Sequence, residues 1–81
     1  MSENIGLKWP AVCALDAELM RARSKFPGNN RLFLALSEEV GEVAKAILEG
    51  ADYRKEALHV ACVAMRIVEE GCKEIEERGT K

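Results

Sequence analysis

At 81 residues the chain has room for one small domain, whose own hydrophobic core would be marginal. Hydrophobic residues nevertheless make up 48% of it, which favours burial between the subunits of a homo-oligomer. The formal net charge is −2 with both signs interspersed, so the sequence offers no broad basic surface for a nucleic-acid polymer. Only 5% of the residues are aromatic, and the abundance of alanine, leucine, glutamate and lysine is typical of helical proteins.

The sequence contains neither the apolar segment of a signal peptide nor the ~20 apolar residues that a membrane span requires. Its three cysteines, Cys13, Cys62 and Cys72, match no metal-binding spacing. On a shared helix Cys62 and Cys72 would lie about 15 Å apart, too far for a disulfide bond. We therefore expect a cytoplasmic protein with reduced cysteines and no membrane partner.

The first predicted element is a helix over about residues 8–25. Pro10 suits its first turn, and apolar residues recur along it at helical spacing. The segment 26–30 (FPGNN) is turn sequence and ends this helix. Either Asn29 or Asn30 is predicted to cap the helix that follows.

The second and third predicted elements are also helices. The second runs from about residue 31 to 49 and stops at Gly50, a favoured residue beyond a helix C-terminus. Asp52 is predicted to cap the third helix, over residues 53–78. No stretch alternates as a strand would, so we predict a single all-α domain over residues 1–81.

The second predicted helix places an acid in the middle of an apolar stripe. At ~100° per residue, one stripe is formed by Leu32, Leu36, Val40, Val43 and Ile47. Glu39 falls inside this stripe and Glu42 lies at its edge. Burying an ionised carboxylate without a partner is costly, so Glu39 needs compensation. A divalent cation held by several carboxylates would supply it.

The third predicted helix is apolar almost all round over residues 57–68, which predicts contacts with several other helices. Its polar exceptions share one side and are Glu56, His59, Arg66 and Glu70. Glu56 and His59 are three residues apart and can reach a common point. Because converging carboxylates repel one another, Glu39, Glu42 and Glu56 beside His59 predict a shared Mg²⁺ or Mn²⁺.

The same residues also allow a purely structural interpretation. Glu42 can pair with Lys45, and Arg66 can pair with Glu70, as ordinary ion pairs within one helix. His59 can be a packed histidine, and the cysteines can be small core residues. From spacing alone, a cation site and a set of paired or solvated side chains both remain open.

Two motifs lie on these faces of the helices. Residues 38–42 (EEVGE) have the form E-E-x-x-E, and residues 55–67 (KEALHVACVAMRI) have the form of E-x-x-D followed by an alanine-rich apolar run. Together with residues 34–46, they resemble the MazG-like superfamily of all-α nucleoside triphosphate pyrophosphohydrolases. The resemblance covers roughly residues 20–70. E-E-x-x-E alone is a weak signal, but the second motif at this distance makes the pair fairly specific.

The resemblance implies a three-helix chain that completes a helical bundle as a homodimer or homotetramer. It also implies a hydrolase that cleaves the α–β phosphoanhydride of a nucleotide, releasing a nucleoside monophosphate and pyrophosphate. Glu39, Glu42 and Glu56 would be ligands of Mg²⁺, and Glu38 would add acidity or orient the attacking water as a catalytic residue.

Substrate contacts are expected near the first break. Phe26 and Trp9 would stack on a nucleotide base. Lys25 and Arg31, with the neighbouring bases of the first helix, would meet phosphates. As solvated charges these basic residues would have no such role.

One position departs from the family pattern, because His59 stands where the second motif usually ends in aspartate. Imidazole suits Mn²⁺ and other transition metals better than Mg²⁺. The site would then hold fewer metals, prefer another metal, or have lost activity. The alternative function is therefore a non-catalytic nucleotide-binding or helical assembly protein. A helical interaction module without a small-molecule site is a third reading, which the position of Glu39 disfavours.

Overall fold

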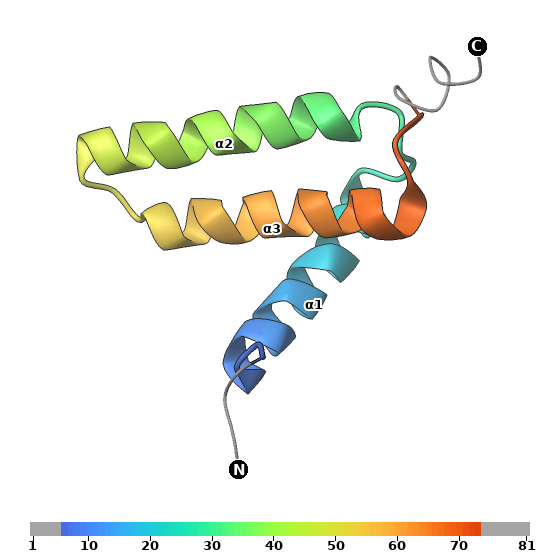
Figure 1. Cartoon of the computed structure of the whole chain (residues 1–81), viewed down its shortest axis with the longest axis horizontal. Coiled ribbons are helices and arrows are strands. Elements are labelled where there is room, and N and C mark those ends of the chain that lie inside the picture. Colours follow the sequence, from blue (N-terminus) through green and yellow to red (C-terminus); the bar gives the residue numbers. More distant parts are fainter. Residues whose placement is uncertain (1–5, 74–81) are drawn as a thin grey trace.

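The computed structural model describes residues 6–73, which form three α-helices (Figure 1). Helix α1 spans Trp9–Lys25, α2 spans Leu32–Glu49 and α3 spans Tyr53–Glu70. The described residues contain no strand, which confirms the prediction of an all-α fold.

The local sequence explains most of the helix ends. Pro10 occupies the first turn of α1, where its missing N–H leaves no helical hydrogen bond unmade. Gly50 ends α2 in the left-handed conformation with φ of 71°, and its N–H bonds to the Ala46 and Ile47 carbonyls. The Asp52 side chain caps α3 by accepting hydrogen bonds from the backbone N–H groups of Arg54 and Lys55, at 3.1 and 3.3 Å.

Two predicted ends were wrong. The residue preceding α2 is Arg31, with no side-chain cap, because Asn29 instead donates to the carbonyl of Glu70 at 2.7 Å. Helix α3 ends at Glu70 rather than at residue 78, because Gly71 adopts a φ of 79° that an α-helix cannot continue through. Residues 74–78, which the prediction also assigned to this helix, lie outside the described part of the chain.

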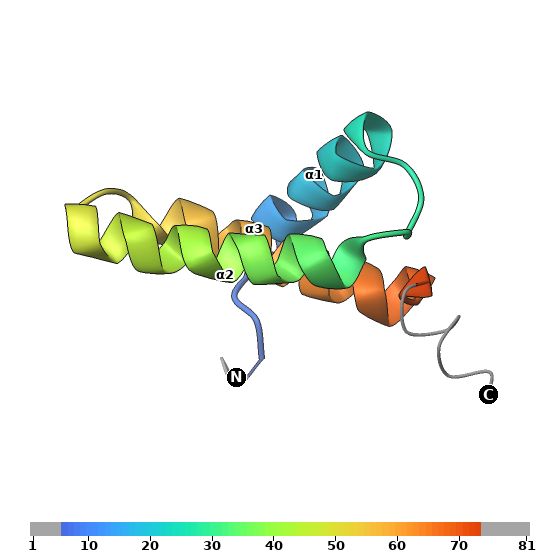
Figure 2. The same ribbon diagram turned by 90° about the horizontal axis from the view of Figure 1, so that it is seen from above.

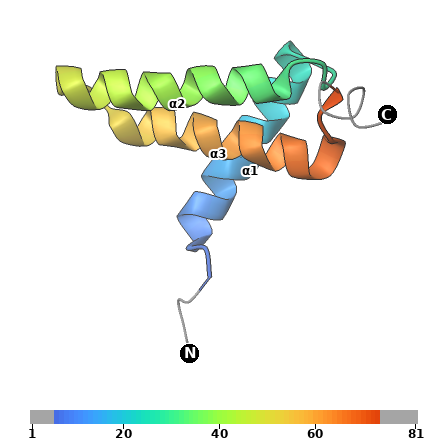
Figure 3. The same cartoon turned by 45° about the horizontal axis from the view of Figure 1, so that its top comes forward.

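Helix α3 is the centre of the arrangement. Helices α2 and α3 lie side by side and antiparallel, and α1 crosses α3 at a steep angle (Figures 2 and 3). Close backbone contacts link α3 to both other helices, whereas α1 and α2 share none. Two helices thus contact the apolar segment 57–68, but its circumference is only partly covered, since Val68 is 76% exposed.

The buried apolar core within one chain is small. Among the described residues, it consists of Leu19, Leu32, Ala46, Cys62 and Cys72. The stripe predicted for α2 is only partly covered, since Val40 and Ile47 are 53% and 59% exposed. The face of α2 that packs on α3 is instead centred on Leu32, Glu39 and Ala46, which recur every seven residues.

A second apolar face of α2 is only partly covered by the described part of the chain. We call it the outer face, and it comprises Phe33, Val40, Ile47 and Leu48. Gly41 lies between these positions, and a Cβ built on it would meet no atom within 4 Å. The described part of the chain therefore leaves much of this apolar face of α2 in contact with water.

No disulfide bond joins Cys13, Cys62 and Cys72, and Cys62 and Cys72 are buried. None of the described helices combines the length and hydrophobicity needed to cross a membrane.

Candidate metal centre

The antiparallel packing of α2 against α3 brings Glu39, Glu56 and His59 together. One ligand atom from each lies within 4.8 Å of the other two, and all three residues are half-buried. Nδ1 of His59 lies 3.3 Å from Oε1 of Glu56 and 3.7 Å from Oε1 of Glu39. The group therefore combines two carboxylates from different helices with one imidazole nitrogen.

The position of Glu39 follows from the spacing of its helix. It lies seven residues after Leu32 and seven before Ala46, and both of these are buried against α3. Glu56 lies in the first turn of α3, where the helix dipole favours a negative charge. His59 follows one turn later on the same face.

The environment disfavours the ionised form of Glu39. Burial is the main reason why the pKa of Glu39 is raised above its usual value, and the charge of His59 acts in the opposite direction. The charges of Glu56, Glu42 and Glu38 raise this pKa further. A cation between Glu39, Glu56 and His59 would remove this repulsion, as the sequence had suggested for Glu39.

A further acid, Glu18 of α1, reaches the same histidine from the other side. Its Oε2 lies 3.7 Å from Nε2 of His59, and its side chain is only 14% exposed. Arg21 holds this carboxylate through two contacts, one of them a hydrogen bond from Nε at 3.2 Å. This hydrogen bond is the main reason why the pKa of Glu18 is lowered.

Sequence reasoning missed Glu18. The only local signal was that Glu18 lies three residues before Arg21, a spacing that is typical of an ordinary ion pair on a helix surface. Its approach to His59 depends on how α1 crosses α3, which spacing within one helix does not define.

A cavity of about 590 Å³ opens beside this group. Its acidic and imidazole lining comes from Glu18, Glu38, Glu39 and His59. Its remaining charged lining comes from Arg21, Arg31 and Arg66. Phe26 adds an aromatic ring to the wall. The cavity thus offers both cation ligands and guanidinium groups within one space.

The structure places the predicted substrate residues differently. Phe26 and Arg31 line the cavity. Lys25 does not line it, and its ammonium lies 5.8 Å from the centre of the Phe26 ring. Trp9 begins α1, is 73% exposed, and is also absent from the lining. Only Phe26 and Arg31 of these four are therefore positioned to touch a ligand there.

The predicted acids also differ in position. Glu38 lines the cavity, although its side chain is outside the group of Glu39, Glu56 and His59. Glu42 is exposed and belongs neither to that group nor to the cavity wall. Its role as a ligand stays a prediction.

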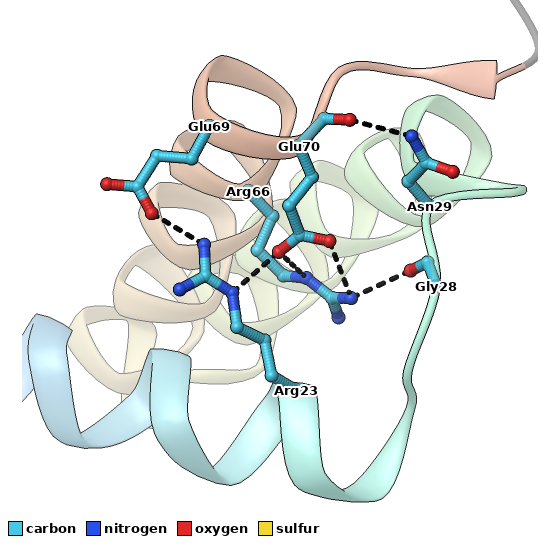
Figure 4. A network of polar contacts seen from close by, with 6 residues as sticks. All are labelled: Arg23, Gly28, Asn29, Arg66, Glu69 and Glu70. Carbon is cyan, nitrogen blue, oxygen red and sulfur yellow. Dashed lines mark hydrogen bonds and ion pairs between the residues drawn. The ribbon is translucent and has the colours of Figure 1, made fainter.

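A network of polar contacts joins helix α1, the loop 26–31 and helix α3, and we call it the polar clasp (Figure 4). Its members are Arg23, Gly28, Asn29, Arg66, Glu69 and Glu70. Arg66 is only 4% exposed and donates to the Gly28 carbonyl at 2.8 Å and to the Glu70 carboxylate at 3.0 Å. The ion pair between Arg66 and Glu70 that was predicted from their spacing is therefore confirmed.

The clasp also includes α1. Arg23 donates from Nε to Glu70 and from Nη2 to Glu69, both at 2.6 Å. The loop 26–31, which provides part of the cavity wall, is therefore held to α3 by Arg66, and the end of α1 is held to α3 by Arg23. These contacts between segments could not be predicted from spacing within one helix.

The donor set fits a divalent cation. Carboxylate oxygens accept Mg²⁺ and Mn²⁺, and an imidazole nitrogen shifts the preference toward Mn²⁺ and other transition metals. No protein-family model matches the chain, and no curated protein or solved structure matches it either. Functional inference therefore depends on the site and on the sequence motifs.

Proposed function

We propose that this protein is a metal-dependent nucleotide pyrophosphohydrolase. It would cleave the α–β phosphoanhydride of a ribo- or deoxyribonucleoside triphosphate and release a nucleoside monophosphate and pyrophosphate. The proposal rests on one observation: Glu39, Glu56 and His59 converge beside a cavity that Arg21, Arg31 and Arg66 also line. The resemblance of residues 38–42 and 55–67 to MazG-like motifs supports it.

In this proposal Glu39, Glu56 and His59 hold Mn²⁺ or Mg²⁺, with Glu42 as a further ligand if its side chain turns inward. The cation would supply charge neutralisation at the phosphates and a more acidic water. Glu38 lines the cavity close to this group and would orient that water.

The other cavity residues are assigned to the substrate. Arg31 is exposed in the cavity wall and would bind phosphate oxygens, for which the planar guanidinium is well suited. Phe26 would stack on the base. Arg66 is already bonded to Gly28 and Glu70, so its role would be to hold the loop that presents Phe26 and Arg31.

The protein would act as a homodimer or homotetramer in the cytoplasm. The outer face of α2 supports an oligomer, because a second copy would remove its apolar side chains from water. Cys13, Cys62 and Cys72 form no disulfide bond with one another, which is consistent with a reducing compartment.

The decisive experiment is an assay of product formation from each common ribo- and deoxyribonucleoside triphosphate, with Mg²⁺ and Mn²⁺ in parallel. Monophosphate and pyrophosphate should appear together, whereas diphosphate and phosphate would indicate cleavage at the β–γ bond. Glu56→Gln should lower the turnover by about 100-fold or more, since loss of a ligand should cost at least as much as loss of a residue that orients one. Glu49→Gln, which changes an exposed acid of α2, should leave turnover unchanged.

Two outcomes would contradict the proposal. If folded protein binds nucleotide with metal but turns none over, the chain is a non-catalytic nucleotide-binding protein. If it binds neither metal nor nucleotide, it is a helical assembly protein. Equal loss of activity in Glu49→Gln and Glu56→Gln would argue for general destabilisation rather than for a specific site.

A further inference from the structure

The two nitrogens of His59 face different partners. Nδ1 faces Glu56 and Glu39, from α3 and α2, at 3.3 and 3.7 Å. Nε2 faces Glu18 of α1 at 3.7 Å. The imidazole of a central helix is thus flanked by carboxylates from all three helices, with two on one edge of the ring and one on the other.

We propose that Glu18 is a positioning residue for His59, accepting a hydrogen bond from Nε2–H so that Nδ1 faces the cation held with Glu39 and Glu56. This inference rests on the proposed function, because it requires that the group binds a metal. It adds α1 to a site that the sequence motifs confine to α2 and α3.

The chemistry of imidazole supports this assignment. A neutral imidazole carries one proton, so coordination through Nδ1 leaves the proton on Nε2. That N–H then lies in a half-buried place where an acceptor is needed. A carboxylate acceptor fixes the ring orientation and makes the ligating nitrogen more basic.

Glu18 is well suited to be that acceptor. It is largely buried and held by Arg21, so its carboxylate has few other orientations. The distance of 3.7 Å between Oε2 and Nε2 exceeds that of a hydrogen bond, and we expect it to shorten when the cation binds.

His59 can be observed directly because the chain contains one histidine. Protein labelled with ¹⁵N in the imidazole gives one pair of ring nitrogen signals, and Zn²⁺ serves as a diamagnetic probe. The titration is performed at a pH where the ring signals of the metal-free protein no longer change. In the wild type, Zn²⁺ should shift Nδ1 as the ligating nitrogen while Nε2 keeps its proton.

Glu18→Ala should weaken Zn²⁺ binding by about 10- to 100-fold, measured by calorimetry. Glu18→Gln keeps an acceptor oxygen and should lose less. Asp16→Ala removes an exposed acid from the same helix and should bind Zn²⁺ as the wild type does. Thermal unfolding of each variant shows whether it is folded, and Glu18→Gln remains informative if Glu18→Ala is not.

The outcomes separate the two proposals. Coordination through Nε2, or wild-type affinity in Glu18→Ala, would overturn the role of Glu18 and leave the proposed function intact. A stability loss in Glu18→Ala without any change in Zn²⁺ affinity would also overturn it, since Glu18 would then only support the fold. Absence of Zn²⁺, Mn²⁺ and Mg²⁺ binding by the wild type would overturn the metal-dependent function itself, and this inference with it.

Discussion

Glu39 occupies a place in which a carboxylate is tolerated but not favoured. Its side chain is 30% exposed and faces His59 across the contact between α2 and α3. Burial and neighbouring acids raise its pKa, so the folded chain binds a proton there more readily than the unfolded chain does. We therefore expect Glu39 to contribute to metal binding while lowering the free energy of unfolding of the metal-free protein at neutral pH.

Glu39→Gln should lower metal affinity by about 100-fold or more, because a ligand is lost. Without metal, its free energy of unfolding at neutral pH should equal or exceed that of the wild type. The group contributes most to wild-type stability below its unfolded pKa, and the contribution is lost as the pH rises through the raised folded pKa. The advantage of the variant should therefore shrink on acidification, which denaturant titrations across pH will measure.

Glu49→Gln is the control for this change, since Glu49 is exposed on the same helix. Marked unfolding of Glu39→Gln at neutral pH, with Glu49→Gln unaffected, would mean that Glu39 forms a stabilising ion pair with His59 instead.

At the scale of the helices, the polar clasp determines how α1 and the loop 26–31 sit on α3. The apolar contribution to this docking is small, because Leu19 is the only buried residue of α1. Arg66 is almost fully buried, so its charge depends on Glu70 and on the Gly28 carbonyl for compensation. The Glu70 carboxylate therefore contributes both to the end of α1, where Arg23 also pairs with Glu69, and to the cavity wall through Arg66.

Glu70→Gln should lower the free energy of unfolding by about 1.5–3 kcal/mol at neutral pH, the usual range for a hydrogen bond to a charged group. The pKa of Glu70 is lowered, chiefly by its hydrogen bond from Arg66. Its contribution is therefore present above the unfolded pKa and is lost as the pH falls through the folded pKa. Urea titrations at neutral and acidic pH should show the difference narrowing in acid.

Glu69→Gln provides a matched control, because Glu69 also pairs with Arg23 but is 53% exposed. Its effect should stay below about 1 kcal/mol. Equal losses in the two variants would show that the buried Arg66 does not depend on Glu70.

At the scale of the whole molecule, the central helix α3 contacts α2 on one side and α1 on another, and much of α2 is left exposed. The outer face comprises Phe33, Val40, Ile47 and Leu48, of which Leu48 is 86% exposed. A glycine within a helix costs about 1 kcal/mol relative to alanine, and nothing in the described chain approaches Gly41. A close approach by a second copy would account for both features.

Sedimentation should therefore find the wild type as a dimer or tetramer, with a melting temperature that rises with protein concentration. A double substitution of Val40→Glu and Ile47→Glu should give monomers of lower stability, because two charges would have to be buried in the interface. Lys45→Glu, on the polar side of the same helix, should leave assembly unchanged. A monomeric wild type would contradict this prediction.

How far the sequence predicts this structure depends on whether a feature lies within one helix or between helices. Glu39 could be singled out because helical periodicity alone places it among apolar residues. Gly50 and Asp52 defined their helix ends because their preferences are local. Glu18 and Arg23 could not be assigned, because their contacts depend on the crossing of α1 over α3.

The end of α3 could not be predicted from the sequence for a different reason. A single glycine within a long helical pattern can be tolerated at modest cost, so Gly71 did not identify the end on its own. The positive φ of Gly71 accompanies the contacts of Asn29 with Glu70 and Lys73, which bring a distant loop to that point. In the same way Val40 and Ile47 share a stripe with Leu32 by periodicity, but only the position of α3 decides which side of the stripe is covered.

The exposure of Trp9 has a practical consequence for optical spectroscopy. It is the only tryptophan of the chain and lies at the start of α1, outside the cavity lining. Its emission is therefore a poor reporter of a nucleotide bound beside Phe26. Instead, a blue shift that grows with protein concentration would report that another subunit covers this end of α1.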